Sequence, residues 1–147
     1  MQFFLDNIFL ILAAFISGGL LVWPLATRGS SARQVNTLGA TQLLNAEDAI
    51  LIDIRETTEL SKGQVPQATH MPGSTFAEQI GEVVKLAQSG KKPRPVILMC
   101  ASGFRSTQAG RKLRKAGVAD VYSLEGGFDA WKQAGLPVSQ KAGRTNT

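Results

Sequence analysis

A single cysteine, Cys100, stands where a short apolar run meets a glycine-bearing turn. The run, residues 96–99, has four consecutive apolar side chains, which is typical of a strand buried on both faces. The turn that follows consists of Ala101, Ser102, Gly103, Phe104 and Arg105. Residues 106–115 then predict a helix, whose free N–H groups and dipole lower the pKa of a nearby cysteine. We therefore expect Cys100 to be a reactive thiolate near neutral pH.

Four residues around this turn have types suited to holding an anion beside the thiol. Gly103 permits the positive φ values that a ring of inward-facing amides needs. Arg105 has a permanent positive charge and a planar set of donors that match an oxyanion. Ser106 or Thr107 is expected to cap the following helix. The alternative interpretation is a structural cysteine buried at the end of a strand, which is common for free cysteines.

Composition limits the possible functions. The chain has 147 residues and a net charge of +5, but its basic residues are spread along the sequence and form no run interleaved with aromatic residues. Nucleic-acid binding is therefore not expected. One cysteine excludes an internal disulfide and fits a reducing compartment. His70 is the only histidine, and one histidine with one cysteine makes a poor metal site, so neither metal nor cofactor is expected.

The N-terminal part of the chain contains a long apolar stretch. Residues 8–23 have no charge, and residues 24–26 extend the stretch to nineteen residues. A helix of that length spans about 28 Å, close to the thickness of a bilayer core. Trp23 and two phenylalanines near the other end stand where interfacial aromatic residues would. The pattern predicts a transmembrane helix over residues 8–26 after a short segment, residues 1–7. A cleaved signal peptide and a buried core helix are the alternatives.

The charges that flank this stretch set its expected orientation. Arg28 and Arg33 follow it, and no basic residue precedes it. Because positive charge stays on the cytoplasmic side, we expect an inner-membrane protein with its N-terminus outside and the rest of the chain in the cytoplasm. Ala14 and Gly18 are four residues apart, a spacing through which two such helices could form a dimer. Residues 27–36 are polar, as in a linker.

Apolar runs alternate with helix-like segments in the rest of the chain. Strands are expected at 49–53, 68–71, 96–99 and 118–124, and helices at 37–45, 56–62, 74–89, 106–115 and from 126 onward. This alternation indicates an α/β domain over residues 37–138, with a parallel sheet between helices, before a disordered tail at 139–147. Asp53 and Arg55 follow one strand at the sheet edge where ligands bind in such folds. They are expected to form a supporting ion pair or to contact substrate.

Four ordered motifs resemble those of the rhodanese family. They are residues 51–55 (LIDIR), 63–68 (GQVPQA), 100–106 (CASGFRS) and 124–131 (LEGGFDAW). The resemblance covers residues 37–138, and the layout with one apolar N-terminal helix resembles the small membrane-bound rhodaneses of bacteria. It implies a three-layer α/β fold, with a central, mostly parallel sheet, that carries sulfane sulfur as a persulfide on Cys100. One difference is Gln64, where the family often has histidine.

The resemblance also implies roles for the residues of the site. The Cys100 thiolate would take the outer sulfur of thiosulfate or of a persulfidated protein and pass it to a thiol or cyanide. The amides of residues 101–106 and the Arg105 guanidinium would hold the anionic sulfur, and Asp53, Arg55 and Glu59 would support them. Because the turn has no second cation beside Arg105, thiosulfate is expected to be a weak donor.

Two other functions are compatible with the same fold. Dual-specificity phosphatases of the cell-cycle type share it, as do related arsenate reductases, but the phosphatase loop is one residue longer than the interval from Cys100 to Arg105. A shorter ring of amides encloses less volume, and no aspartate stands in the first helical turn to protonate a leaving alkoxide. The other alternative is a binding module without turnover. An inactive module would be expected to have lost the thiol or the arginine, and both are present.

Overall fold

The structure, a computed structural model, describes residues 7–27 and 31–140. The chain divides into two compact units, Met1–Ser30 and Ser31–Thr147. The first contains the helix α2 (Ile8–Thr27). Residues 1–6, residues 28–30 of the predicted linker and residues 141–147 of the predicted tail lie outside the described residues.

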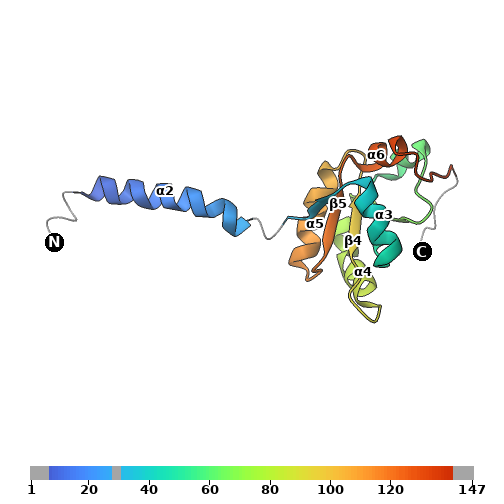
Figure 1. Ribbon diagram of the computed structural model, residues 1–147, viewed down its shortest axis with the longest axis horizontal. Coiled ribbons are helices and arrows are strands. Elements are labelled where there is room, and N and C mark those ends of the chain that lie inside the picture. The colour runs from blue at the N-terminus through green and yellow to red at the C-terminus, as the bar shows by residue number, and fades with distance from the viewer. Residues whose placement is uncertain (1–6, 28–30, 141–147) are drawn as a thin grey trace. The chain divides into compact units, whose positions relative to one another are not determined.

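In residues 31–140, five parallel strands form one sheet. They are β1 (Arg33–Val35), β2 (Ile50–Asp53), β3 (Thr69–His70), β4 (Val96–Met99) and β5 (Val121–Leu124). Their order across the sheet is β1-β5-β4-β2-β3, so β4 lies at the centre (Figure 1). Every residue of β2 and β4 is buried. Because both faces of these strands are buried, all residues of β4 and all residues of β2 before Asp53 are apolar.

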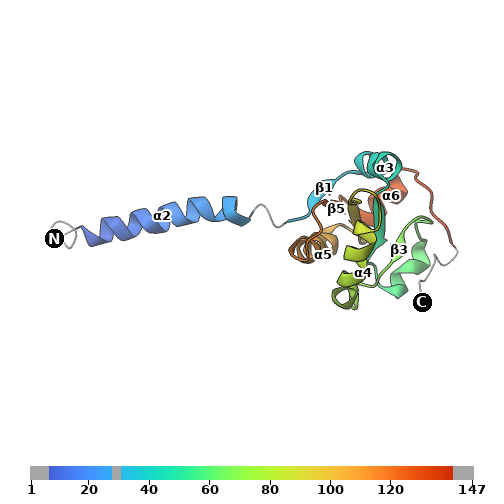
Figure 2. The ribbon, with the colours of Figure 1, turned by 90° about the horizontal axis from the view of Figure 1, so that it is seen from below.

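Helices cover both faces of the sheet. They are α3 (Thr37–Ala46), the short 3₁₀ helix η2 (Thr57–Lys62), α4 (Phe76–Gln88), α5 (Phe104–Lys115) and α6 (Gly127–Gln133). Side chains alternate along β4, so that Leu98 belongs to the core under α4 and α5, whereas Met99 belongs to the core under α3 and α6. Figure 2 shows these two pairs of helices on opposite sides of the sheet. The sheet therefore separates two apolar cores.

The parallel register brings polar residues to one edge of the sheet. Asp53 at the end of β2 is opposite Met99 at the end of β4, and Ser123 of β5 is opposite Leu98. Cys100 follows Met99 directly. The ends of three adjacent strands therefore deliver Asp53, Cys100 and Ser123 to the edge where α/β proteins bind ligands.

The predicted α/β architecture with a central parallel sheet is confirmed, but its extent differs at both ends of the domain. Residues 33–35, which were expected to belong to a linker, form β1 and pair with β5. Ser139, expected to begin a disordered tail, exchanges two backbone hydrogen bonds with Gln64, of 2.8 and 2.7 Å. The sheet therefore begins before the predicted domain, and an isolated antiparallel bridge lies just beyond its predicted C-terminal end.

The prediction of a transmembrane helix over residues 8–26 is wrong. A helix does form there, but among the described residues no helix is long and apolar enough to cross a membrane.

Two further predictions depended on that helix. The predicted inner-membrane location placed the N-terminus outside and the domain in the cytoplasm. This prediction was derived from the charges flanking the predicted transmembrane helix, and it is wrong because no described helix is long and apolar enough to cross a membrane. A dimer formed by two anchors through Ala14 and Gly18 is left without a basis.

Candidate active site

Cys100 lies at the junction of β4 and α5 and has no exposed surface. Helix α5 begins at Phe104, two residues before its predicted start. Its N-cap is Gly103, whose φ of +101° lies in the left-handed region. The prediction that Ser106 or Thr107 caps the helix is therefore wrong. Because glycine adopts this conformation without a steric penalty, the chain can turn from strand to helix directly after the cysteine.

The sulfur of Cys100 is surrounded by hydrogen-bond donors. The N–H of Gly103 donates to Sγ over 3.0 Å, and the hydroxyl oxygen of Ser106 lies 3.6 Å from Sγ. Burial raises the pKa of Cys100, but hydrogen bonds from the Ser106 hydroxyl and from the amides of Ser106, Gly103 and Ser102 lower it by more. The net pKa lies below the ordinary value for cysteine. The thiolate is therefore present at lower pH than in a free cysteine.

The start of α6 holds the cysteine loop from the opposite side. The N–H of Phe128 donates to the Cys100 carbonyl oxygen over 2.7 Å, and the N–H of Asp129 donates to the Ala101 carbonyl oxygen over 3.3 Å. A Cβ at Gly127 would overlap the carbonyl oxygen of Cys100, so this close approach requires glycine. With its carbonyl groups bound to α6, the loop leaves its amides available to the sulfur.

A cluster of three hydroxyl groups lies at the base of the loop. The hydroxyl oxygens of Ser106, Thr107 and Ser123 lie 2.9, 3.0 and 3.3 Å from the carbonyl oxygen of Gly103. Ser106 and Ser123 are also 2.6 Å apart, oxygen to oxygen, and both are buried. Ser123 is not among the site residues predicted from the sequence. It could have been found as a polar residue at a buried position of a strand that enters the core.

Arg105 forms a two-pronged ion pair with Glu59 at the rim of the loop. Its Nη1 and Nη2 donate to the two Glu59 oxygens over 2.8 and 2.7 Å. The hydrogen bond from Arg105 is the main reason that the pKa of Glu59 falls to about 2, and the same bond raises the pKa of Arg105. The side chains are 41% and 29% exposed. Glu59 therefore lies beside the loop, and it partly neutralises the arginine that was expected to hold the anionic sulfur.

Asp53 and Arg55 form a second ion pair in the interior. Nη2 of Arg55 lies 2.7 Å from Oδ2 of Asp53, and the side chains are only 1% and 3% exposed. The same nitrogen donates to the Gly63 carbonyl over 2.9 Å, and the guanidinium lies 3.7 Å from the centre of the Phe128 ring. Of the two roles left open by the sequence, this burial fits a supporting ion pair that joins β2 to α6.

His70 and the other polar residues of the described chain offer no metal site. Nε2 of His70 lies 2.8 Å from the Arg55 carbonyl oxygen, which ties β3 to the segment after β2. In residues 7–27 and 31–140, no group of three or more histidine, cysteine, aspartate or glutamate side chains is placed to hold a metal ion.

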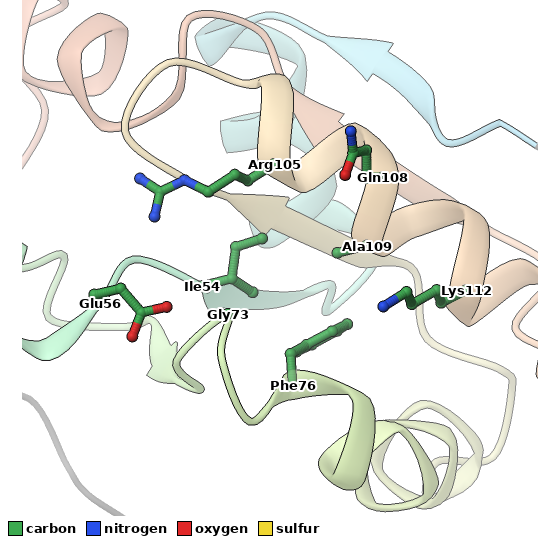
Figure 3. A pocket seen from close by; sticks show the side chains of 8 residues that line it. All are labelled: Ile54, Glu56, Gly73, Phe76, Arg105, Gln108, Ala109 and Lys112. Atoms are coloured by element: carbon green, nitrogen blue, oxygen red, sulfur yellow. The ribbon is translucent and has the colours of Figure 1, made fainter.

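A pocket of about 160 Å³ opens next to the loop arginine (Figure 3). Its lining combines apolar and charged side chains, which include Ile54, Phe76, Ala109, Glu56, Arg105 and Lys112. Figure 3 shows Glu56 and Arg105 on one side of the pocket and Lys112 on the other. The carboxylate of Glu56 is held in place by the backbone N–H and the hydroxyl of Ser74, at 2.9 and 3.0 Å. The pocket has room for a small molecule beside the thiol loop.

Known proteins are similar to this chain in both sequence and fold. The family profile of the rhodanese-like domain matches residues 39–134. A sulfurtransferase of Allochromatium vinosum is 35% identical over 97 residues, which are 66% of this chain and 84% of that protein.

Solved structures show the same fold. A rhodanese-related protein of Thermoplasma volcanium has a TM-score of 0.60 and 26% identity, with 74% of this chain and 99% of that one covered. A protein of unknown function from Rhodopseudomonas palustris, described as a possible tyrosine phosphatase, has a TM-score of 0.63 and 26% identity, with 74% and 85% covered. From the profile match and the curated relative, the chain belongs to the rhodanese family.

Proposed function

We propose that the protein is a sulfurtransferase that carries sulfane sulfur as a persulfide on Cys100. The observation that carries this proposal is the N–H of Gly103, which donates to the buried Cys100 sulfur over 3.0 Å. With the other donors of the loop it lowers the thiol pKa, and the thiolate is the form that attacks sulfur. The similarity to the Allochromatium vinosum sulfurtransferase supports the same activity.

The reaction has two half-reactions. The Cys100 thiolate attacks the outer sulfur of the donor, a new S–S bond forms, and the bond between that sulfur and the donor breaks. With thiosulfate, sulfite leaves with the electron pair, and Cys100–S–S⁻ remains. A thiolate or cyanide then attacks the outer sulfur, and the electron pair of the broken S–S bond returns to Cys100. The loop amides and the dipole of α5 stabilise the negative charge in each state.

The charge at the loop favours a persulfide over thiosulfate as the physiological donor. Thiosulfate is a dianion, and Arg105, the cation of the loop, already donates both terminal nitrogens to Glu59. A persulfidated small thiol or protein carries less charge on its sulfur. The adjoining pocket, with Phe76 and Ile54 among its apolar residues, can receive the carbon part of a small thiol acceptor.

The loop geometry argues against phosphatase activity, although one similar structure is described as a possible tyrosine phosphatase. The loop from Cys100 to Arg105 is one residue shorter than the phosphatase loop, so its amides enclose a smaller volume, which suits a single sulfur atom better than a tetrahedral phosphate. The first turn of α5 contains no acidic residue that could protonate a leaving alkoxide. A binding module without turnover would have no need of a thiol with a lowered pKa.

Formation of thiocyanate from cyanide tests the proposal. We expect the wild-type protein to form thiocyanate with cysteine persulfide and, more slowly, with thiosulfate, and Cys100→Ser to show only the background rate. Equal rates for the two proteins would refute the proposal. Hydrolysis of p-nitrophenyl phosphate by the wild type but not by Cys100→Ser would instead support the phosphatase alternative.

A further inference from the structure

The hydroxyl cluster under the thiol loop contains more donors than its shared acceptor can use. The oxygens of Ser106, Thr107 and Ser123 all lie within 3.3 Å of the Gly103 carbonyl oxygen. A carbonyl oxygen has two lone pairs, and each hydroxyl has one hydrogen to donate. The N–H of Thr107 also donates to this oxygen, over 3.3 Å, so one lone pair is left for the three hydroxyls. The hydrogens of the other two hydroxyls are therefore available for other acceptors.

Ser106 is the member of the cluster that contacts the sulfur. Its oxygen lies 3.6 Å from the Cys100 sulfur and 2.6 Å from the Ser123 oxygen. Both serines have no exposed surface, so their hydrogen bonds must be completed within the protein. Thr107 is fixed from another side, because Nε2 of Gln34 donates to its oxygen over 2.9 Å. The hydrogen of Thr107 is thereby left to donate to the Gly103 carbonyl oxygen or to the Ser123 oxygen, which lie 3.0 and 3.3 Å away.

We propose that Ser123 is a positioning residue for the reaction of Cys100, because its hydroxyl donates to the Ser106 oxygen and directs the Ser106 hydrogen to the thiolate. This inference rests on the proposed function, in which the thiolate is the attacking group. Ser123 contacts neither the sulfur nor a substrate in this arrangement. It acts through Ser106.

The cluster has a hydrogen-bond arrangement for each state of the sulfur. When Cys100 is a neutral thiol, its S–H donates to Ser106, and Ser106 donates to Gly103. When Cys100 is a thiolate, Ser106 donates to the sulfur and Ser123 donates to Ser106, while Thr107 keeps the Gly103 carbonyl satisfied. The hydroxyls only rotate between these arrangements, and the proton of the thiol passes to solvent. Each buried hydroxyl keeps a partner in both states.

A matched pair of variants at position 123 tests this role in the full-length protein. Ser123→Thr keeps the hydroxyl, and Ser123→Val has the shape of threonine without it. Because Cys100 is the only cysteine, its rate of alkylation by iodoacetamide against pH reports its pKa. We expect Ser123→Thr to keep the wild-type value and Ser123→Val to raise it by roughly half a unit to one unit, the effect of one hydrogen bond.

The charged groups around the loop do not change in these variants. They are Arg105 on α5, Glu59 on η2, Asp53 and Arg55 at the end of β2, and Asp129 on α6. A difference in thiol pKa between Ser123→Thr and Ser123→Val therefore reports the hydroxyl alone. If neither variant folds, Ser123→Ala is compared with the wild type, with the same expected rise.

A double-mutant cycle separates positioning from a general structural effect. Ser106→Ala should raise the thiol pKa at least as much as Ser123→Val, and the double variant should raise it no further, because Ser123 acts through Ser106. An unchanged pKa in Ser123→Val, or additive effects in the double variant, would overturn the inference.

The thiol pKa is measured by alkylation and does not depend on sulfur transfer. The proposed role of Ser123 and the proposed sulfurtransferase activity can therefore fail separately. An unchanged thiol pKa in Ser123→Val, in a protein whose wild type transfers sulfur, refutes only the role of Ser123. A raised pKa in a protein whose wild type transfers no sulfur refutes only the sulfurtransferase proposal.

Discussion

Two arginine–carboxylate pairs near the same edge of the sheet have the same separation and opposite surroundings. The closest nitrogen–oxygen distance is 2.7 Å both in the Arg55–Asp53 pair and in the Arg105–Glu59 pair. The side chains of the first pair are 1% and 3% exposed, and those of the second are 41% and 29% exposed. Burial, and not distance, decides what the loss of one charge costs.

The difference in burial indicates different tasks. The buried Arg55 also donates to Gly63 and lies on the ring of Phe128, whose N–H holds the carbonyl of Cys100. The buried pair therefore helps to keep the shape of the thiol loop. The exposed pair of Arg105 and Glu59 lies at the rim of the thiol loop, where solvent and substrate can reach it. Its net charge therefore affects how strongly an anionic sulfur donor is attracted to the loop. We expect mutations in the first pair to affect stability and mutations in the second to affect donor choice.

Asp53→Asn is expected to have the largest effect. It leaves the Arg55 guanidinium charged and buried without a counter-charge, so the free energy of unfolding should fall by about 3–5 kcal/mol. Urea denaturation followed by circular dichroism measures this loss. A loss below about 1 kcal/mol would mean that the buried pair is no more important than an exposed one.

The double variant Asp53→Leu with Arg55→Met serves as the control for charge. It removes both charges and keeps apolar volume, so it should lose less stability than Asp53→Asn. A greater loss in the double variant would show that the contacts of Arg55 with Gly63 and Phe128 outweigh its ion pair.

Glu59→Gln is expected to change donor use more than stability. The free energy of unfolding should change by less than about 1 kcal/mol, because the pair is partly exposed. Removal of the negative charge leaves Arg105 free to attract the thiosulfate dianion, so the KM for thiosulfate should fall by roughly threefold to tenfold at low salt. The gain should shrink as ionic strength rises. An unchanged or higher KM in the thiocyanate assay would show that Glu59 is needed to hold Arg105 in a productive position.

Acid should weaken the small contribution of the exposed pair. The pKa of Glu59 is lowered from 4.5 to about 2, chiefly by its hydrogen bond from Arg105. A carboxyl with a lowered pKa in the folded state stabilises the protein above its unfolded pKa, and this stabilisation is lost as the pH falls through the folded value. The difference in unfolding free energy between the wild type and Glu59→Gln should therefore be constant above pH 4.5 and decrease from there towards pH 2. A difference that stays constant over this range would contradict the assignment.

Local sequence patterns were sufficient to predict four of the five strands of the sheet and the position of the thiol after a buried strand, but not β1. The apolar runs that became β2 and β4 are continuous because both faces of these strands are buried. Gly103 was expected to take a positive φ, and it does so at +101°. These features depend on residues that are close together in the chain.

The ion pair between Asp53 and Arg55 was among the expectations from the sequence, but the contacts that join residues far apart in the chain could not be predicted from local patterns. Arg105 and Glu59 are 46 positions apart, and Ser106 and Ser123 are 17 apart. No local pattern shows which carboxylate will meet the arginine, or that a serine of β5 will lie under the loop. The predicted transmembrane helix is wrong on a separate finding, because no helix among the described residues is long and apolar enough to cross a membrane.

The proposal that Cys100 accepts a sulfur atom is tested most directly by intact mass spectrometry. The protein is incubated with cysteine persulfide or thiosulfate and separated from the donor, and its intact mass is measured. We expect the mass of the wild type to increase by one sulfur atom and to return to its original value on addition of cyanide, and the mass of Cys100→Ser to stay unchanged. No gain on the wild type, or an equal gain on Cys100→Ser, would contradict the proposed function.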